Sequence, residues 1–170
     1  TDSTRLARLR STPSARRRLD HRSGSYAAVM VEPEVAPAGL RFGTDGVRAR
    51  AGTRLDEQSV RALGLVAAPL LGTDRVVVGR DTRESGLGLS LALAEGLSEG
   101  GLQVVSLGVA PTPAVAHVAA ADGAAGAVVS ASHNPWYDNG VKLFSAGGWQ
   151  LDDVVQSAVQ AADRTSAAEG

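Results

Sequence analysis

The fold of this chain is decided by the stretch Gly126-Ala-Val-Val-Ser-Ala-Ser-His-Asn-Pro-Trp-Tyr-Asp-Asn-Gly-Val-Lys-Leu-Phe144. It opens with a short apolar run, residues 127–129, bounded by small residues, which predicts a buried strand. Residues 141–144 predict a second strand. The triplet Asp138-Asn-Gly140 predicts a tight turn just before that strand, because asparagine and glycine tolerate positive φ angles. A polar loop is therefore expected between two strands.

This loop carries the side chains with the clearest chemical potential. Its polar members are Ser130, Ser132, His133 and Asn134, and Pro135 closes it. The second strand adds Lys142, the only lysine in the chain. A hydroxyl beside an imidazole and an amide, with an ammonium group on the next strand, indicates a group that handles phosphate.

Composition sets the broad class. At 170 residues the chain is long enough for one domain with its own core. Its 17 basic and 18 acidic side chains nearly balance, so no nucleic-acid partner is expected. Without cysteine there is no thiolate nucleophile or thiolate metal site. No apolar run reaches the ~20 residues of a membrane span, so we expect a cytoplasmic α/β domain without a membrane partner.

The first 40 residues differ from the rest. Residues 1–30 hold seven arginines against two aspartates and few large apolar side chains, which predicts disorder. Such a composition is also typical of a transit peptide, and Met30 is an alternative start. We favour an extension or a misplaced start, because the chain prefers arginine throughout. The expected organisation is a disordered Arg/Ser-rich extension over 1–40 and a folded domain over 41–170.

Helices and strands alternate through the folded part. The expected helices are 53–71 with Thr53 as cap, 85–99 with Ser85 as cap, 114–121 with Thr112 as cap, and 151–162, and the expected strands between them are 75–79, 102–107 and 127–129. This order predicts a three-layer α/β/α domain with a mostly parallel sheet.

Ligands gather beyond the carboxyl ends of strands in such sheets. The loops at those ends, 80–84, 110–113 and 130–135, are therefore the expected site. Within the first of them, Arg80 and Asp81 are expected to pair with each other and brace the loop. Residues 41–48 carry two glycines around Thr-Asp, which predicts a tight loop ending in an exposed Arg48.

Two kinds of chemistry fit a serine beside a histidine. A hydrolase triad is disfavoured, because adjacent side chains seldom point at one another and no G-x-S-x-G elbow surrounds Ser132. Phosphoryl transfer fits better, since it needs cations and hydrogen-bond donors rather than a strong base. Arg48 and Lys142 would supply charge, and Asn134 and the loop amides would supply donors.

Four motifs occur in a fixed order. They are Phe42-Gly-Thr-Asp-Gly-Val-Arg48, Val78-Gly-Arg-Asp-Thr-Arg83, Pro111-Thr-Pro-Ala-Val-Ala116, and Ser130-Ala-Ser-His-Asn-Pro135 followed by Asp138-Asn-Gly-Val-Lys142. Their series resembles the α-D-phosphohexomutases. The opening and serine motifs are most similar to the bacterial phosphoglucosamine mutase branch of that family.

The resemblance implies the family's N-terminal domain, with Ser132 as the phosphoserine. Ser132 would exchange phosphate with a hexosamine phosphate through a 1,6-bisphosphate, interconverting glucosamine 6-phosphate and glucosamine 1-phosphate. Its phosphate would also be a Mg²⁺ ligand. By the same resemblance, His133 and Lys142 would handle protons or stabilise phosphate, and Arg48 would be an active-site arginine.

Two departures from the family pattern limit these expectations. Ala49 stands where the family usually has glycine, which is expected to stiffen that loop. The family's three further domains carry the Asp-rich Mg²⁺ loop, the sugar-recognition loop and a phosphate-binding loop, and the sequence shows no such Asp-Gly-Asp run. We therefore expect the domain to be inactive without those missing C-terminal domains as partners. A phosphomannomutase or phosphoglucomutase domain, and a non-catalytic domain that binds a sugar phosphate or another partner, stay open as alternatives.

Overall fold

The structure, a computed structural model, describes residues 42–43, 46–151 and 157. Its elements in chain order are β1 (Phe42–Gly43), β2 (Gly46–Arg50), α1 (Glu57–Ala67), a 3₁₀ turn (Ala68–Leu70), β3 (Arg75–Arg80), α2 (Gly86–Glu99), β4 (Gln103–Val109), α3 (Thr112–Ala121), β5 (Ala125–Val129) and β6 (Asp138–Phe144). The extension expected over 1–40 lies outside the described residues, as does the helix expected over 151–162 except at residues 151 and 157.

The described strands form one six-stranded sheet in the order β1-β2-β6-β5-β3-β4. Strand β3 pairs in parallel with β4 and β5, and α2 and α3 make the crossovers between parallel strands. The pairs β5–β6, β6–β2 and β2–β1 are antiparallel. The sheet expected to be mostly parallel is thus mixed, with a parallel centre at β4-β3-β5.

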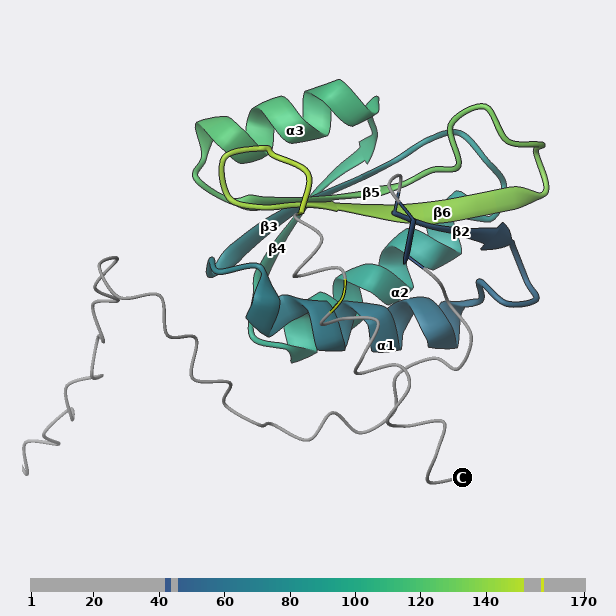
Figure 1. Cartoon of the computed structure of the whole chain (residues 1–170), viewed down its shortest axis with the longest axis horizontal. Helices are drawn as coiled ribbons and strands as arrows, with labels where there is room; N and C mark the ends of the chain where they lie inside the picture. The colour runs from purple at the N-terminus through teal and green to yellow at the C-terminus, as the bar shows by residue number, and fades with distance from the viewer. Residues whose placement is uncertain (1–41, 44–45, 152–156, 158–170) are drawn as a thin grey trace, which may run out of the picture. The chain divides into compact units, whose positions relative to one another are not determined.

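Helices cover both faces of the sheet, which confirms the three-layer α/β/α prediction (Figure 1). Helices α1 and α2 lie on one face and α3 lies on the other. Strand β3 serves both layers, because successive side chains of a strand point to opposite faces. Val76 and Val78 belong to the core on the α1–α2 side, whereas Val77 packs with Val115 of α3.

Helix α1 begins later than predicted, and Thr53 is not its cap. Asp56 is the N-cap: its Oδ1 accepts the Ser59 N–H at 2.8 Å, and the Ser59 hydroxyl accepts the Asp56 N–H at 3.0 Å. This reciprocal capping box satisfies two backbone donors at once. The Thr53 hydroxyl instead donates to the Arg50 carbonyl at 2.9 Å, in the preceding turn. Pro69 falls in the 3₁₀ turn after α1, so it removes no bond from the helix itself.

The Asp56 cap makes helix stability depend on pH. The hydrogen bond from the Ser59 backbone N–H is the main cause that lowers the pKa of Asp56 below its ordinary value of 3.8. A lowered folded-state pKa stabilises the fold fully above the unfolded-state value and loses that contribution as pH falls through the folded-state pKa. Asp56→Ala should cost about 1 kcal/mol of unfolding free energy at neutral pH, and less at acid pH.

Urea unfolding at pH 7 and pH 3 tests this prediction, with Asp56→Asn as the control. Asparagine keeps the acceptor oxygen but carries no charge, so Asp56→Asn should cost less than Asp56→Ala at pH 7, and its own stability should lack the loss at acid pH that Asp56 causes in the parent chain. Equal losses for the alanine variant at both pH values would contradict a charged cap.

The other two predicted capping residues make no side-chain capping bond. Ser85 holds the N-cap position of α2 as predicted, but its hydroxyl accepts from the Asn139 side chain at 2.9 Å instead of capping the helix. Pro111, not Thr112, holds the N-cap position of α3. In both cases a tertiary contact or proline geometry takes the place of the local cap.

The predicted turn at Asp138-Asn-Gly140 is instead the start of β6, which pairs with β2. Asn139 is fully buried, and its Oδ1 accepts the Gly140 N–H at 2.9 Å. Gly140 is needed because a Cβ there would lie 2.5 Å from the Val47 carbonyl oxygen. Close approach of two strands, rather than a turn, explains the glycine.

None of the helices in the described ranges is long and apolar enough to cross a membrane.

Candidate active site

The site lies at the edge of the sheet where β3, β4 and β5 end. The Asp81 N–H donates to the Val129 carbonyl at 3.1 Å, and the Ala110 N–H donates to the Arg80 carbonyl at 3.0 Å. These bonds bring the ends of the three parallel strands together. Residues 130–137, which join β5 to β6, are called the serine loop from here on.

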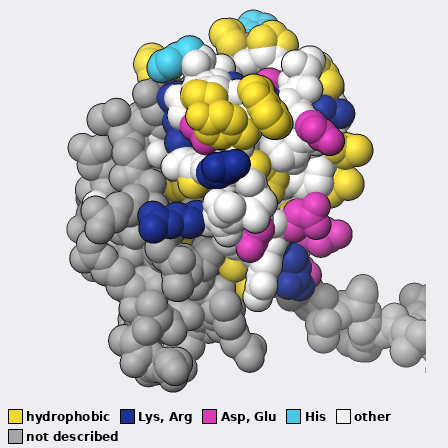
Figure 2. All heavy atoms as spheres, turned by 90° about the vertical axis from the view of Figure 1, so that its right-hand side faces the viewer, with side chains coloured by type: hydrophobic (Ala, Val, Ile, Leu, Met, Phe, Trp, Pro, Cys, Tyr) yellow, Lys and Arg dark blue, Asp and Glu magenta, His cyan; other side chains and the backbone are white. Residues whose placement is uncertain are grey.

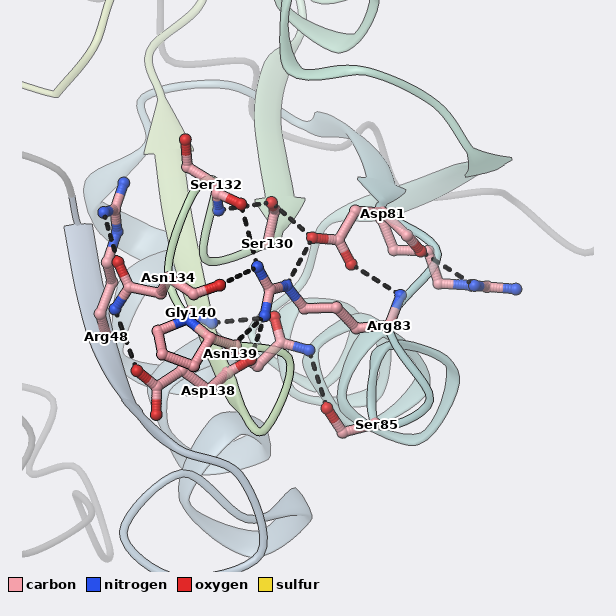
Figure 3. Close-up of polar contacts among 12 residues, drawn as sticks. Arg48, Asp81, Arg83, Ser85, Ser130, Ser132, Asn134, Asp138, Asn139 and Gly140 are labelled. Atoms are coloured by element: carbon pink, nitrogen blue, oxygen red, sulfur yellow. Dashed lines mark hydrogen bonds and ion pairs between the residues drawn. The ribbon is translucent and has the colours of Figure 1, made fainter.

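Ser132 has an unusual backbone conformation. Its φ of 53° is the only positive φ of a non-glycine residue in the described part of the chain. Its N–H donates to the Ser130 hydroxyl at 3.1 Å, and its carbonyl accepts from Arg83 at 2.9 Å. The side chain is exposed, and Figure 3 shows its hydroxyl pointing away from the Arg83 guanidinium. Such strained positions cluster at functional sites.

Arg83 lies at the centre of the polar network around the serine loop (Figure 3). Its guanidinium donates to four main-chain carbonyls, those of Ser132, Asn134, Pro135 and Asp138, at 2.5 to 2.9 Å. Its Nε donates to the Asp81 carboxylate at 3.0 Å. The Arg83 side chain is only 11% exposed.

The Asp81 carboxylate also links Arg83 to the serine loop through hydrogen bonds. The Ser130 hydroxyl donates to Asp81 Oδ2 at 2.7 Å, and Asp81 Oδ1 accepts the Arg83 N–H at 3.0 Å. The predicted pairing of Asp81 with Arg80 is therefore wrong, because Arg80 reaches only the Asp81 main-chain carbonyl, at 3.1 Å. The spacing of Asp81 and Arg83 lets both side chains reach the loop.

Arg48 enters the site from strand β2. It is half-buried within that strand, so the prediction of an exposed Arg48 was wrong, and Ala49 is also a strand residue. The two glycines of the predicted tight loop, Gly43 and Gly46, pair with each other between β1 and β2, and residues 44–45 lie outside the described part of the chain. The Arg48 Nη1 donates to Asn134 Oδ1 at 3.3 Å. The Asn134 amide in turn donates to Asp138 Oδ2 at 3.1 Å.

Lys142 lies on the same face of the sheet as Arg48. Arg48 pairs with Gly140 across β2 and β6, and Lys142 is two residues further along β6. The partner of Lys142 on β5 is Val128, which packs in the core beneath α3. Both cations therefore rise from the α3 side of the sheet.

The structure brings some of the predicted site residues together. Ser132, His133 and Asn134 share the serine loop, and Asn134 binds Arg48. His133 is exposed. Ser130, Asp81 and Arg83 lie in the loops predicted to form the site, but no contacts between these two loops were predicted. The sequence did offer one signal for Asp81 and Arg83, their Asp-x-Arg spacing in the loop that follows β3. The residues that these two side chains bind could not be predicted, because they depend on how the strands pack side by side.

An aromatic pair follows the nucleophile candidate. Trp136 is 78% exposed, and its ring meets Tyr137 edge-on with centroids 5.7 Å apart. The Arg50 guanidinium lies 5.2 Å from the Tyr137 ring centre. Figure 2, which looks at the right-hand side of Figure 1, shows large apolar side chains next to basic ones on this face.

No group of three or more His, Cys, Asp or Glu side chains among the described residues is placed to hold a metal ion. A cation at this site would therefore need ligands beyond these side chains. An exposed Ser132 carrying phosphate fits that need, because phosphate oxygens are hard ligands of the kind Mg²⁺ prefers.

Comparison with known proteins identifies the domain. Residues 39–168 match the family model described as phosphoglucomutase/phosphomannomutase, alpha/beta/alpha domain I. The chain belongs to this family. The match covers all four motifs, so the phosphohexomutase resemblance is confirmed.

Individual relatives show which members of the family this chain resembles. The chain is 47% identical over 125 residues to the phosphoglucosamine mutase of Pseudoalteromonas atlantica, covering 71% of this chain and 28% of the relative. It is 48% identical over 132 residues to that of Frankia alni, covering 70% and 29%. A third, from Rhodococcus jostii, is 47% identical over 130 residues, covering 72% and 29%. These relatives confirm the resemblance to bacterial phosphoglucosamine mutases.

Solved structures of the family share the fold. A phosphoglucomutase/phosphomannomutase family protein from Burkholderia thailandensis is 33% identical, with a TM-score of 0.63, over 73% of this chain and 30% of that one. Parafusin, a phosphoglucomutase from Paramecium, has a TM-score of 0.66 at 19% identity, over 76% of this chain and 26% of that one, and shows the likeness of fold alone.

Proposed function

We propose that this domain supplies the phosphate-carrying serine, Ser132, of a phosphoglucosamine mutase reaction. The observation that carries the proposal is the exposed hydroxyl of Ser132 at a strained position in a loop held by Arg83. The chain spans 28 to 29% of the length of the curated relatives that it matches. The other groups that the reaction needs therefore lie beyond the matched part of those relatives.

The proposed reaction moves one phosphoryl group twice. The bond between phosphorus and the Ser132 Oγ breaks as the free hydroxyl of glucosamine 6-phosphate attacks, which forms the 1,6-bisphosphate and leaves a serine oxyanion. The proton lost by the sugar hydroxyl goes to a base. The second half is the reverse: the Ser132 Oγ attacks the 6-phosphate, and the leaving sugar oxygen takes a proton. Glucosamine 1-phosphate is released and phosphoserine is restored.

The remaining residues would serve these transfers. Arg48 would bind a substrate phosphate and is held in place by Asn134. Lys142 would balance charge on the transferring group, since phosphoryl transfer depends on positioning and electrostatic stabilisation. His133, exposed next to the nucleophile, would handle the proton of the sugar hydroxyl.

Mg²⁺ would bind through the Ser132 phosphate, together with ligands outside this domain. When bound, it would offset negative charge on the transferring phosphoryl group. We also place the enzyme in the cytoplasm, where sugar phosphates are metabolised, with a hexosamine phosphate as substrate.

A chimera tests the proposal. The matched segment of this chain replaces its counterpart in the Rhodococcus jostii phosphoglucosamine mutase, and turnover of glucosamine 6-phosphate with Mg²⁺ is measured. We expect turnover within about tenfold of the parent enzyme, because the domain supplies the nucleophile and the parent supplies the rest. A folded chimera that binds the sugar phosphate without turnover would favour the non-catalytic alternative.

Lys142 gives a separate prediction in the same chimera. Lys142→Met should lower kcat by about 10²-fold, because the transferring phosphoryl group loses a nearby cation. Lys142→Arg should recover part of the rate by restoring the charge. Steady-state kinetics decides, and equal rates for the methionine and arginine variants would argue against an electrostatic role.

A further inference from the structure

Arg83 has a binding partner for every donor that it carries. A guanidinium has five N–H groups. One donates to Asp81, and the other four bonds go to the carbonyls of Ser132, Asn134, Pro135 and Asp138. These carbonyls lie between residues 132 and 138, from the serine loop to the first residue of β6, and the bonds come from a side chain about 50 residues earlier in the sequence.

The same side chain fixes the direction of the peptide after Ser132. In a trans peptide the carbonyl and the following N–H point in opposite directions, and the described part of the chain has no cis peptide. Because the Ser132 carbonyl points at Arg83, the His133 N–H faces away from it. That N–H has no hydrogen-bond partner within the described ranges. The Ser132 hydroxyl also points away from Arg83 (Figure 3).

We propose that Arg83 is a positioning residue that, with Asp81, holds Ser132 in its left-handed conformation and turns the His133 N–H outward to receive phosphate. This rests on the proposed function of Ser132 as the phosphate carrier. Asp81 fixes the other side of Ser132. Its carboxylate accepts a hydrogen bond from the Ser130 hydroxyl, and that hydroxyl accepts the Ser132 N–H. Both peptide groups of Ser132 are thereby tied to the Asp81–Arg83 pair. An outward N–H beside the hydroxyl is a donor that anion sites use.

Lysine cannot replace this arginine. An ammonium group has three donors around a single point, whereas the guanidinium spreads five donors in a plane. Arg83→Lys therefore keeps the charge and most of the volume but loses at least two of the five bonds. The variant separates the role of the hydrogen-bond pattern from the role of positive charge.

The test compares Arg83→Lys with a matched variant, Arg75→Lys, at an exposed position of β3, the strand that precedes the Arg83 loop, where Nε meets only Gln103. Amide hydrogen exchange is measured on the 170-residue chain, and the rate of phosphate uptake by Ser132 is measured in the chimera with glucosamine 1,6-bisphosphate and Mg²⁺. For Arg83→Lys we expect exchange in residues 130–140 to rise at least about tenfold while β3 and β5 stay protected. The saturating rate of phosphate uptake should fall about 10²-fold, with the half-saturating bisphosphate concentration changed less than about threefold. Arg75→Lys should change neither quantity.

Unchanged exchange in the serine loop, or an unchanged uptake rate, would overturn the proposal. If Arg83→Lys fails to fold, Ser130→Ala takes its place, since it removes the link from Asp81 to the Ser132 N–H and should act in the same direction. If the unmodified chimera takes up no phosphate, the proposed function fails, and the exchange comparison still decides whether Arg83 holds the loop.

Discussion

Replacing Ser132 with alanine is expected to lower kcat of the chimera by at least about 10³-fold, because the reaction loses the only oxygen that carries the phosphate between the two sugar positions. The affinity for the sugar phosphate should change little, since the substrate's other contacts remain. The fold should also persist, because the Ser132 side chain is exposed and its bonds within the loop come from the main chain.

Ser98→Ala is the matched control, as it removes an exposed hydroxyl from α2. We expect the control to turn over at the parent rate. Circular dichroism melting of both variants excludes unfolding as the cause of any loss. Retention of more than about a tenth of the rate by Ser132→Ala would remove Ser132 from the nucleophile role.

Gly96→Ala is expected to destabilise the domain by about 3 kcal/mol, a fall in melting temperature of roughly 10 to 20 °C. A Cβ at Gly96 would lie 1.9 Å from the Arg61 carbonyl oxygen and 2.9 Å from the Leu65 nitrogen, both main-chain atoms of α1. Because neither atom is the end of a flexible side chain, the two helices must move apart. That movement would open the core beneath them.

The matched control lies at the start of the same helix. At Gly86 a Cβ would meet its nearest neighbour at 3.5 Å, an ordinary contact. Gly86→Ala should therefore leave stability nearly unchanged, or raise it by the better helix propensity of alanine. Thermal unfolding of both variants tests the pair, and equal melting temperatures would show that α1 and α2 do not need close contact at Gly96.

Much of the architecture was predictable from local patterns. The continuous Val76-Val77-Val78 run indicates a strand buried on both faces, and its side chains do serve both layers. The alternation of strands and helices predicts three layers. The serine loop was placed correctly between two strands, because a small polar run after apolar residues is a local signal.

The errors arose where distant segments decide the structure. Asp138-Asn-Gly140 has the composition of a turn, but pairing with β2 makes it a strand, and a glycine was needed for the approach of Val47. Ser85 holds the N-cap position of α2 as predicted, but its hydroxyl binds the buried Asn139 instead of the helix backbone. Local propensity cannot anticipate a partner that tertiary packing provides.

The role of Arg83 illustrates the same limit at the candidate site. The sequence places it in a loop at the carboxyl end of β3, where a ligand is expected. An arginine in such a loop indicates anion binding, yet the Arg83 guanidinium donates four of its hydrogen bonds to main-chain carbonyls. Arg83 reaches the serine loop because β3 pairs with β5, which places the loops that follow these two strands next to each other.

The most direct test of the central claim is peptide mass spectrometry of the chimera stopped during turnover of glucosamine 6-phosphate. We expect phosphate on Ser132, and none on the neighbouring Ser130, whose hydroxyl is bound to Asp81. Turnover with Ser132 unmodified, or with phosphate on another residue, would contradict the claim that Ser132 carries the phosphate.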